Sequence, residues 1–364
     1  MIGDGAQRTV LSLGLMSGTS LDGVDAALLR TDGETAGSAG EALTMPYPDE
    51  LRRAIRAVLG GHGPVEEVER DLTLFHAKVA ESLLEKAGRP EVAVVGFHGH
   101  TILHQPDKRR TWQIGDGPLL AERLGIPVVN DFRSADVAAG GHGAPLMPAF
   151  HAALATGAER PLAVLNIGGV ANVTWIGADG GMLAFDTGPG NALVDDWILH
   201  HTGDLYDKDG AIAAQGQADL DAVGRFLAHP YFAKKPPKSL DRDDFRIWAD
   251  SLVAGKNIAD GAATLAAFTV AAVAAAREWL PQAPGTWLVC GGGRHNATLM
   301  TGLRQSLRAT VEAVEARGWD GDALEAQGFA YLAVRSLLKL PLSWPGTTGV
   351  PEPLAGGRVH HPPA

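Results

Sequence analysis

Apolar strand patterns that end in glycine-rich turns constrain this chain most, because the same layout occurs once in each half. In the first half it reads LGLMSGTSLDGVDAALL, and in the second it reads LNIGGVANVTWI. Each copy is a strand, a tight turn and a strand that returns, and helix and strand patterns follow it. The copies share this architecture rather than their residues. The layout predicts an α/β protein of two related units with a ligand cleft between them.

A glycine- and proline-rich stretch separates the two halves. Residues 140–148 contain three glycines and two prolines, a composition typical of a connection between domains. The chain length of 364 residues also favours two domains, because one domain usually takes ~100–200 residues. We expect an N-terminal domain over residues 1–140 and a C-terminal domain over residues 141–364. Whether the C-terminal tail packs on the first domain is left open.

Composition limits the partners of the protein. Acidic residues number 42 against 31 basic ones, a formal net charge of −11, and a surface of this sign repels nucleic acid and anionic lipid. The single cysteine, Cys290, allows no intramolecular disulfide, and the first residues carry no secretory signal pattern. The longest apolar run, Leu265–Ala276, is shorter than the ~20 residues that span a bilayer and predicts a buried helix. We expect a cytoplasmic protein that binds neither nucleic acid nor membranes.

Three glycine-rich turns are candidate binding loops. The first consists of Gly18, Thr19, Ser20, Leu21, Asp22, Gly23, Val24 and Asp25, the second contains Gly168 and Gly169, and the third contains Gly291, Gly292 and Gly293. Backbone N–H groups in such turns bind anions, the hydroxyls of Thr19 and Ser20 add donors, and Asp22 or Asp25 could bind Mg²⁺. Any one of these turns could equally be an ordinary structural turn. Their recurrence at strand ends in both halves favours a binding function.

Asp186 is the candidate catalytic residue. It follows an apolar strand and precedes a rigid Gly-Pro-Gly turn, and carboxylates at strand ends project into the ligand clefts of open α/β sheets. A purely structural role as a helix cap is the alternative. Asn191 lies closer to the helix expected from Ala192 and is the better cap, so the catalytic interpretation is favoured.

Histidines form the last candidate group. His98, His100 and His104 follow a predicted strand, and His142 comes later. Their spacing is compatible with a metal site, but no cysteine and no obvious carboxylate completes a ligand set. Solvated or hydrogen-bonding histidines beside a ligand cleft are the favoured interpretation. Cys290 lies on an apolar strand and is most simply a small core residue.

Taken together and in order, the motifs of this chain resemble the anhydro-N-acetylmuramic acid kinase family from near residue 10 to near residue 350. The strings are GLMSGTSLDGVDAAL, GFHGHT, QIGDG, DFRSADVAAGG, GAPLMPAFH, LNIGGVANVT, FDTGPGNALVDDW, PPKSLDRDDF, CGGGRHN and DALEAQGFAYLA. The resemblance implies two related ribonuclease-H-like domains of the actin and hexokinase type with ATP in the cleft between them. It implies phosphorylation of O6 of 1,6-anhydro-N-acetylmuramic acid with opening of the anhydro ring, in the recycling of cell-wall peptidoglycan, by a homodimer.

The resemblance also implies roles for single residues. Gly18 to Asp25 would form the ATP phosphate loop, with Asp22 beside Mg²⁺. Gly168 and Gly169 would face the phosphates, and Gly291, Gly292, Gly293 and Asn296 would face the nucleoside. Asp186 would be the catalytic base, Glu325 would contact the sugar, and Arg133 would pair with the lactyl carboxylate. The chain departs from the family pattern at His100 and His142, where glutamine is expected, and at KSLDRD, where KSTGRE is expected. These departures bear on substrate contacts rather than on the reaction class.

One carboxylate suffices for this chemistry. Water attacks C1 of the anhydro sugar while Asp186 takes its proton, and the departing O6 attacks the γ-phosphorus of ATP. Two alternatives remain open. An ordinary amino-sugar kinase of the same fold would use Asp186 to deprotonate a free hydroxyl. An ATP-dependent binding protein of the actin and Hsp70 type would show no sugar-dependent turnover.

Overall fold

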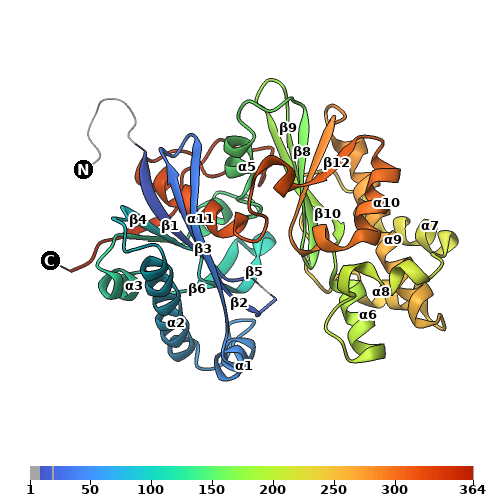
Figure 1. Cartoon of the computed structure of the whole chain (residues 1–364), viewed down its shortest axis with the longest axis horizontal. Helices are drawn as coiled ribbons and strands as arrows, with labels where there is room; N and C mark the ends of the chain where they lie inside the picture. Colours follow the sequence, from blue (N-terminus) through green and yellow to red (C-terminus); the bar gives the residue numbers. More distant parts are fainter. Residues whose placement is uncertain (1–8, 19, 364) are drawn as a thin grey trace. The chain divides into compact units, whose positions relative to one another are not determined.

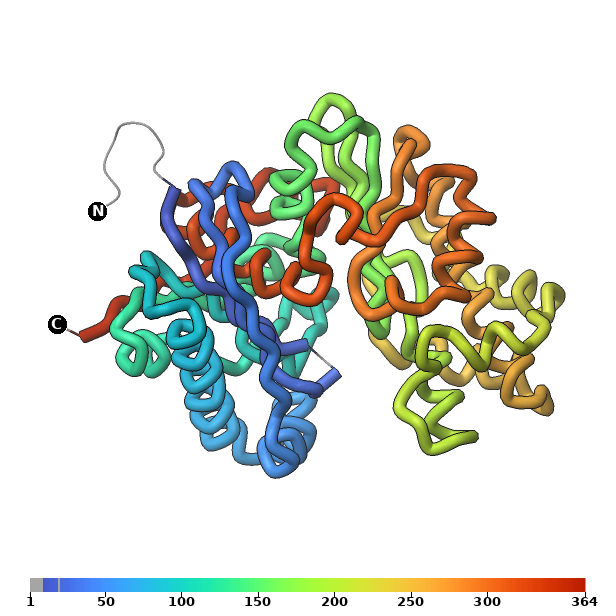
Figure 2. The backbone as a smooth tube through the Cα atoms, viewed as in Figure 1, coloured from blue at the N-terminus to red at the C-terminus, as the bar shows by residue number. Residues whose placement is uncertain are grey.

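The computed structural model describes residues 9–18 and 20–363 (Figure 1). The chain forms two compact units. Unit 1 takes the chain up to Thr156 and again from Ala323 onward, and unit 2 is Gly157–Asp322. The path of the chain can be followed in Figure 2, where the red C-terminal segment lies among the blue and cyan elements of unit 1.

The limits of these units differ from the expected boundary after residue 140. α5 (Pro148–Leu154) belongs to unit 1 because it packs against α11 (Leu324–Leu337), with the rings of Phe150 and Tyr331 5.5 Å apart. The glycine-rich stretch therefore precedes a helix that remains with the first unit. The C-terminal helix and tail return to the first unit as well.

Unit 1 is built on a six-stranded sheet in the order β13-β7-β4-β1-β2-β3. Its strands are β1 (Val10–Met16), β2 (Gly23–Thr31), β3 (Ala36–Pro46), β4 (Val94–Phe97), β7 (Val128–Asn130) and β13 (Arg358–His360). A separate hairpin consists of β5 (His100–Gln105) and β6 (Arg110–Ile114). The remaining helices are α1 (Asp49–Ala57), α2 (Val65–Lys86), α3 (Gly117–Leu124) and α4 (Ser134–Ala138), with a 3₁₀ turn at Pro106–Lys108.

A pair of glycines explains why α11 can lie against this sheet (Figure 1). Gly14 of β1 and Gly96 of β4 are register partners on adjacent parallel strands. A Cβ at Gly14 would lie 1.8 Å from Ala326 O, and a Cβ at Gly96 would lie 2.1 Å from Phe329 O. Only glycine permits such an approach between a helix backbone and a strand backbone.

Unit 2 is built on a five-stranded sheet in the order β10-β9-β8-β11-β12. Its strands are β8 (Leu162–Ile167), β9 (Val170–Ile176), β10 (Met182–Pro189), β11 (Thr286–Cys290) and β12 (Thr310–Ala313). Its helices are α6 (Ala192–Thr202), α7 (Leu220–Leu227), α8 (Arg246–Val253), α9 (Ile258–Ala276) and α10 (Ala297–Leu307). Short 3₁₀ turns cover Lys208–Gly210, Ala213–Gln215, Pro230–Ala233, Arg277–Trp279, Gly292–His295 and Val314–Arg317.

The two sheets share one topology. In each sheet, the first three strands along the chain are antiparallel neighbours, and the next two strands of the sheet, β4 and β7 in unit 1 and β11 and β12 in unit 2, run parallel to the first. Unit 1 adds only β13, antiparallel at the edge beside β7. This is the ribonuclease-H-like arrangement, present twice, so the expected α/β fold class is confirmed.

The helix that contains the apolar run Leu265–Ala276 begins several residues before the run. The run forms the second part of α9, and Ile258–Trp279 is long and apolar enough to span a membrane by length and composition. However, 61% of its most apolar window is buried inside the structure, and α9 contributes Leu265, Phe268 and Val273 to the core of unit 2. The prediction of a buried helix is confirmed.

Candidate active site

The turn between β8 and β9 is the second predicted loop, and the start of α6 braces it. The carbonyl of Gly168 accepts a hydrogen bond from Asn191 N–H at 2.7 Å, and the carbonyl of Gly169 accepts from Gly190 N–H at 2.9 Å and Ala192 N–H at 3.3 Å. A Cβ at Gly190 would lie 2.2 Å from Gly168 O, so glycine is required there. The fold thereby joins two motifs, IGG and DTGPGN, into one surface.

The third loop follows β11 and packs on the end of β8. A Cβ at Gly291 would lie 2.3 Å from Asn166 Oδ1, and one at Gly293 would lie 2.4 Å from Ile167 Cγ2. A Cβ at Gly292 would meet its nearest atom at 3.7 Å, which is ordinary contact. Packing therefore explains Gly291 and Gly293, and Gly292 is the glycine of this loop that leaves room for a ligand.

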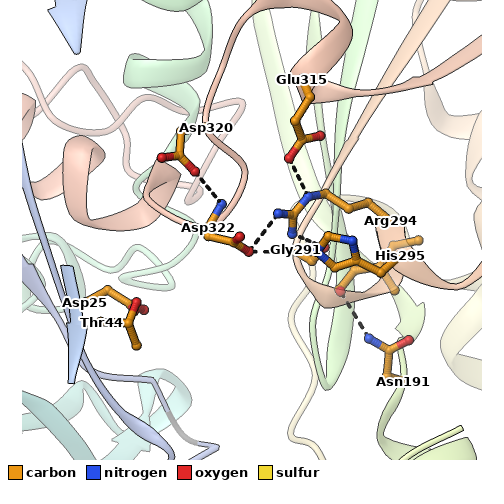
Figure 3. A network of polar contacts seen from close by, with 10 residues as sticks. Asp25, Thr44, Asn191, Gly291, Arg294, His295, Glu315, Asp320 and Asp322 are labelled. Atoms are coloured by element: carbon orange, nitrogen blue, oxygen red, sulfur yellow. Dashed lines mark hydrogen bonds and ion pairs between the residues drawn. The ribbon is translucent and has the colours of Figure 1, made fainter. Parts of the chain in front are cut away.

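Arg294 fixes this third loop, and it is a residue that the sequence analysis did not select (Figure 3). Its guanidinium donates to Glu315 Oε1 and Asp322 Oδ1, both at 2.7 Å, and to Gly291 O at 3.0 Å. The Arg294 side chain is 3% exposed, so these are partly buried ion pairs rather than surface ones. The only sequence signal is the position of Arg294 directly after three glycines.

Asn296, expected beside the nucleoside, has a structural role as well. Its Oδ1 accepts a hydrogen bond from Leu299 N–H at 3.0 Å and so caps α10. Asn191, expected to cap α6, does not do so through its side chain. Its amide donates instead to Ile167 O at 3.2 Å, which strengthens the connection between α6 and the end of β8.

Asp186 lies within β10 rather than after it. The ladder with β9 is irregular between Asp186 and Gly188, and this bulge lets the strand continue to Pro189. The Asp186 carboxyl accepts one hydrogen bond, to Oδ2 from Leu240 N–H at 2.8 Å. Burial raises the pKa of this carboxyl to about 7, against the lowering effect of the Leu240 hydrogen bond. A half-buried carboxyl with a pKa near neutrality is suited to accept a proton at physiological pH.

Arg242, from the KSLDRD string, also lies close to the hairpin tip. Its guanidinium donates to Asp196 Oδ1 at 2.7 Å and to Oδ2 at 3.2 Å, and a Cβ at Gly169 would lie 3.8 Å from Arg242 Cγ. Burial and the nearby charge of Asp196 raise the pKa of Asp195 to about 7, while Arg242 acts in the opposite direction. Arg242 is shared with the expected KSTGRE pattern, as are the lysine and serine that open the string.

In unit 1 the first loop is held by its own side chains. Ser20 Oγ donates to Asp22 Oδ1 at 2.7 Å, and Gly23 N–H donates to the same oxygen at 3.0 Å. A Cβ at Gly23 would lie 2.4 Å from Met45 O, whereas one at Gly18 would meet, among the described residues, only Ser20 Oγ at 3.6 Å. Gly23 is therefore needed for packing on β3, and Gly18 has open space around it. Thr19 lies outside the described residues.

The two carboxylates of this loop differ in their partners. Asp22 is exposed, whereas Asp25 Oδ1 accepts from Thr44 Oγ1 at 2.6 Å. Among the described residues, no group of three His, Cys, Asp or Glu side chains gathers that could hold a metal ion. Mg²⁺ is typically bound through one or two carboxylates together with substrate phosphates, so carboxylates at this turn fit a magnesium ion that arrives with a nucleotide.

His100 joins the end of β1 to the β5–β6 hairpin. Tyr47 Oη donates to Ser17 Oγ at 2.6 Å, and Ser17 Oγ lies 2.8 Å from His100 Nδ1. Burial lowers the pKa of His100 to about 4, so the ring is neutral near pH 7 and shares one hydrogen bond with Ser17 Oγ at Nδ1. Neither Ser17 nor Tyr47 stands out in the sequence, although Ser17 directly precedes Gly18.

The two expected substrate residues lie near each other in unit 1. The guanidinium of Arg133 faces His98 Nε2 at 3.0 and 3.2 Å and donates to Gly143 O at 2.7 Å. Burial lowers the pKa of Arg133 to about 10, and the charge of Glu325 opposes that shift. His98 has a pKa well below its usual value, because of burial and then of Arg133. His98 therefore acts as a neutral hydrogen-bond acceptor, and it is a buried hydrogen-bonding histidine rather than a solvated one.

Fold and site together define the class of this protein. Two ribonuclease-H-like units, each with a glycine-containing turn after its first strand, are the architecture of the actin and hexokinase type. Unit 2 adds the half-buried carboxyl of Asp186, and unit 1 adds the half-buried guanidinium of Arg133, on whose pKa the charge of Glu325 acts.

Comparison with known proteins narrows this class to one family. A family model described as anhydro-N-acetylmuramic acid kinase matches residues 10–361. The chain is 63% identical over 355 residues to the anhydro-N-acetylmuramic acid kinase of Paramagnetospirillum magneticum, covering 97% of this chain and 100% of that protein. It is 57% identical to the protein of the same name from Rhodospirillum rubrum, covering 97% of this chain and 94% of that protein. The chain belongs to the anhydro-N-acetylmuramic acid kinase family.

Proposed function

We propose that this protein phosphorylates O6 of 1,6-anhydro-N-acetylmuramic acid with ATP and opens the anhydro ring with water, giving N-acetylmuramic acid 6-phosphate and ADP. Family membership and the names of the relatives support the substrate. The observation in the structure that carries the proposal is the half-buried carboxyl of Asp186, whose pKa is raised to about 7. Such a group accepts a proton from water and is still deprotonated in part at neutral pH.

The atoms balance with Asp186 as the only base. A water oxygen attacks C1, the C1–O6 bond breaks, and the water proton passes to Asp186. The O6 atom, which carries the electrons of the broken bond, attacks the γ-phosphorus, and ADP leaves. Leu240 N–H occupies Oδ2 of Asp186, and no other hydrogen bond to this carboxyl occurs within the described residues, so Oδ1 is the oxygen that takes the proton.

The glycine loops of both units supply the nucleotide contacts in this proposal. The loop from Gly18 to Asp25 and the tip at Gly168 and Gly169 donate backbone N–H groups to phosphate oxygens, and Gly292 lets the third loop approach the nucleoside. Asp22 would hold Mg²⁺, which would neutralise charge on the phosphates.

Glu325 and Arg133 complete the proposed substrate contacts. Glu325 binds the sugar, and Arg133 pairs with the lactyl carboxylate, since a guanidinium matches a carboxylate in geometry and charge. His98 and Gly143 hold the Arg133 guanidinium in place from one side. We further propose a cytoplasmic homodimer that acts in peptidoglycan recycling and has no nucleic-acid or membrane partner.

Product analysis tests the proposal. The protein is incubated in ¹⁸O water with ATP and anhydro-N-acetylmuramic acid, and the products are identified by mass spectrometry. We expect N-acetylmuramic acid 6-phosphate with ¹⁸O at C1 and none in the phosphate. Label in the phosphate would show that water attacks phosphorus and would contradict the coupled mechanism. Equal turnover of free N-acetylmuramic acid would support an ordinary amino-sugar kinase, and ATP hydrolysis independent of any sugar would support an actin- or Hsp70-like binding protein.

A further inference from the structure

The segment from Tyr231 to Leu240 covers the outer edge of β10 at Asp186. β10 is an edge strand of the unit 2 sheet, and the backbone groups of an edge strand need partners. Asp186 N–H donates to Lys238 O at 3.0 Å, and the Asp186 carbonyl accepts a short hydrogen bond from the Tyr231 hydroxyl. Both backbone groups of the proposed base are therefore held by this segment.

Lys238 closes the segment on itself. Its Nζ donates to Tyr231 O at 3.3 Å and lies 4.5 Å from the centroid of the Tyr231 ring, 5.7 Å from that of Trp279 and 5.8 Å from that of Phe185. The residue is 7% exposed, and it forms no ion pair with a carboxylate among the described residues. An ammonium buried among three aromatic rings is stabilised by cation–π attraction, although its burial is unfavourable.

These contacts form a closed ring. The Tyr231 hydroxyl bonds to the Asp186 carbonyl, Asp186 N–H bonds to the Lys238 carbonyl, and the Lys238 ammonium bonds back to the Tyr231 carbonyl. Two residues after Lys238, Leu240 N–H donates to the Asp186 carboxyl itself. The position of that donor is thus fixed by the ring, because Lys238 and Leu240 lie in the same short segment.

We propose that Tyr231 and Lys238 are positioning residues of the reaction: they lock the segment whose Leu240 N–H holds Oδ2 of Asp186 and so leave Oδ1 aimed at water. The inference rests on the proposed role of Asp186 as the base. Lys238 does not act by direct charge on the carboxylate, because the Phe185 ring that it faces and the Asp186 carboxyl leave β10 on opposite sides.

The test compares Lys238→Met and Tyr231→Phe with the unaltered protein. Each change keeps most of the side-chain volume and removes one bond of the ring. We expect kcat to fall roughly 10- to 100-fold, the scale of a misplaced catalytic group, with KM for ATP unchanged. The acidic limb of the kcat/KM profile should move to higher pH, because the Leu240 hydrogen bond lowers the pKa of Asp186. The charged groups that act on the two residues are Asp186 and Asp244 on Tyr231, and Lys234 on Lys238.

Two controls separate positioning from stability. Lys235→Met removes a charge from an exposed lysine of the same segment and should change neither kcat nor the pH profile. Lys238→Arg keeps a cation against the aromatic rings and should restore most of the activity and the original acidic limb. A lower melting temperature with an unmoved acidic limb and normal kcat in both test variants would overturn the inference, since that is the behaviour of a purely structural group.

A double variant distinguishes this inference from the proposed function. If Asp186 is the base and Lys238 acts through it, adding Lys238→Met to Asp186→Asn should lower the residual rate no further. A further tenfold loss would show that Lys238 acts elsewhere and would overturn the inference while leaving the base assignment intact. Near-normal activity of Asp186→Asn alone would instead refute the base assignment.

Discussion

The two units share one strand order but bury titratable groups of opposite kind. Unit 1 buries histidines whose pKa values burial lowers, to about 4 for His76 and His100, to about 3 for His151 and well below the usual value for His98. Unit 2 holds two carboxyls, of Asp186 and Asp195, whose pKa values burial raises to about 7. The topology therefore does not determine the chemistry; the residues that loops and helix starts add to the sheet do.

The turn after the first strand is also held differently in the two units. In unit 2 the tip at Gly168 and Gly169 is braced by backbone N–H groups from the start of α6. In unit 1 the longer turn has one backbone hydrogen bond, from Leu21 N–H to Gly18 O at 3.2 Å, and is otherwise braced by the side chain of Asp22. A turn held by backbone groups tolerates changes of side chain, whereas a turn held by one carboxylate depends on that residue.

The largest expected effect is the loss of turnover in Asp186→Asn. The amide keeps the shape of the carboxyl and accepts no proton, so kcat should fall by roughly 10²–10⁴, the usual range for a positioned general base. Binding of ATP and sugar, measured by calorimetry, should persist. The matched change in unit 1 is Asp22→Asn, which should raise KM for ATP rather than abolish turnover. The reverse pattern would place the base in unit 1.

Gly14→Val should unfold unit 1 while leaving unit 2 intact. A side chain at Gly14 would overlap Ala326 O, from which its Cβ would lie only 1.8 Å away, so α11 would have to leave the sheet. Limited proteolysis should cut unit 1 and release a resistant fragment that covers Gly157–Asp322. Gly18→Val is the control, because the space around Gly18 is open. A native proteolysis pattern for Gly14→Val would refute the packing argument.

Lowering the pH from 7 to 4 should affect the two units in opposite directions. The buried histidines of unit 1 have folded pKa values below 6.5, so as the pH falls they bind protons in the unfolded chain before they bind them in the folded protein. Unit 1 therefore loses stability as the pH falls. The carboxyls of Asp186 and Asp195 stay protonated up to about pH 7 when folded, so their contribution favours unit 2 at lower pH. Hydrogen exchange, corrected for the intrinsic rate, should show unit 1 opening first at pH 5. Earlier opening of unit 2 would contradict this.

Gly18→Val should impair the use of ATP without destabilising the fold. The branched side chain has room in the protein but would block a phosphate that approaches the loop. We expect KM for ATP to rise by about tenfold or more, equivalent to about 1.4 kcal/mol of binding, at an unchanged melting temperature. Gly291→Val in unit 2 should behave in the opposite way, since its Cβ would meet Asn166 Oδ1 at 2.3 Å. Unchanged ATP kinetics in Gly18→Val would refute the assignment of the phosphate loop.

The smallest expected effect is a gain of stability in Asp186→Asn. Above pH 3.8 the unfolded chain ionises this carboxyl, whereas the folded protein resists ionisation until about pH 7. The native carboxyl is therefore destabilising at pH 8 and neutral in its effect below pH 3.8. The variant should melt a few degrees higher than the unaltered protein at pH 8, and the difference should disappear at the acidic end. A lower melting temperature at pH 8 would contradict the pKa shift.

Several elements could be predicted from local sequence because local pattern determines them. The strand Val10–Met16, the helix Val65–Lys86 and the helix Ala297–Leu307 follow from apolar runs and helical spacing. The turns at Gly168 and Gly291 follow from glycines after apolar strands. β3 (Ala36–Pro46) was not predicted, because it is an exposed edge strand of small and polar residues that is defined by pairing with β2.

The residues of the candidate site also divide into those that a local motif indicates and those that only the fold brings together. Asp186, Arg133 and Glu325 stand out by motif, so the sequence indicated them. Tyr231 and Lys238 did not stand out, because their role depends on backbone hydrogen bonds to a strand more than 40 residues away. No periodicity or composition signals such a contact. The departure at His100 was visible in the sequence, but its bond to Ser17 was not.

By itself, the sequence determined the duplicated α/β layout, the glycine loops and the family, since each depends on residues that are close together in the chain. The tertiary structure decided which glycines serve packing and which leave room for a ligand, because that depends on atoms of distant segments. It also decided that the C-terminal helix returns to unit 1, since Gly14 and Gly96 form the groove for it only when β1 and β4 pair. The raised pKa of Asp186 belongs to the same category, because burial is a property of the folded chain and not of the residue.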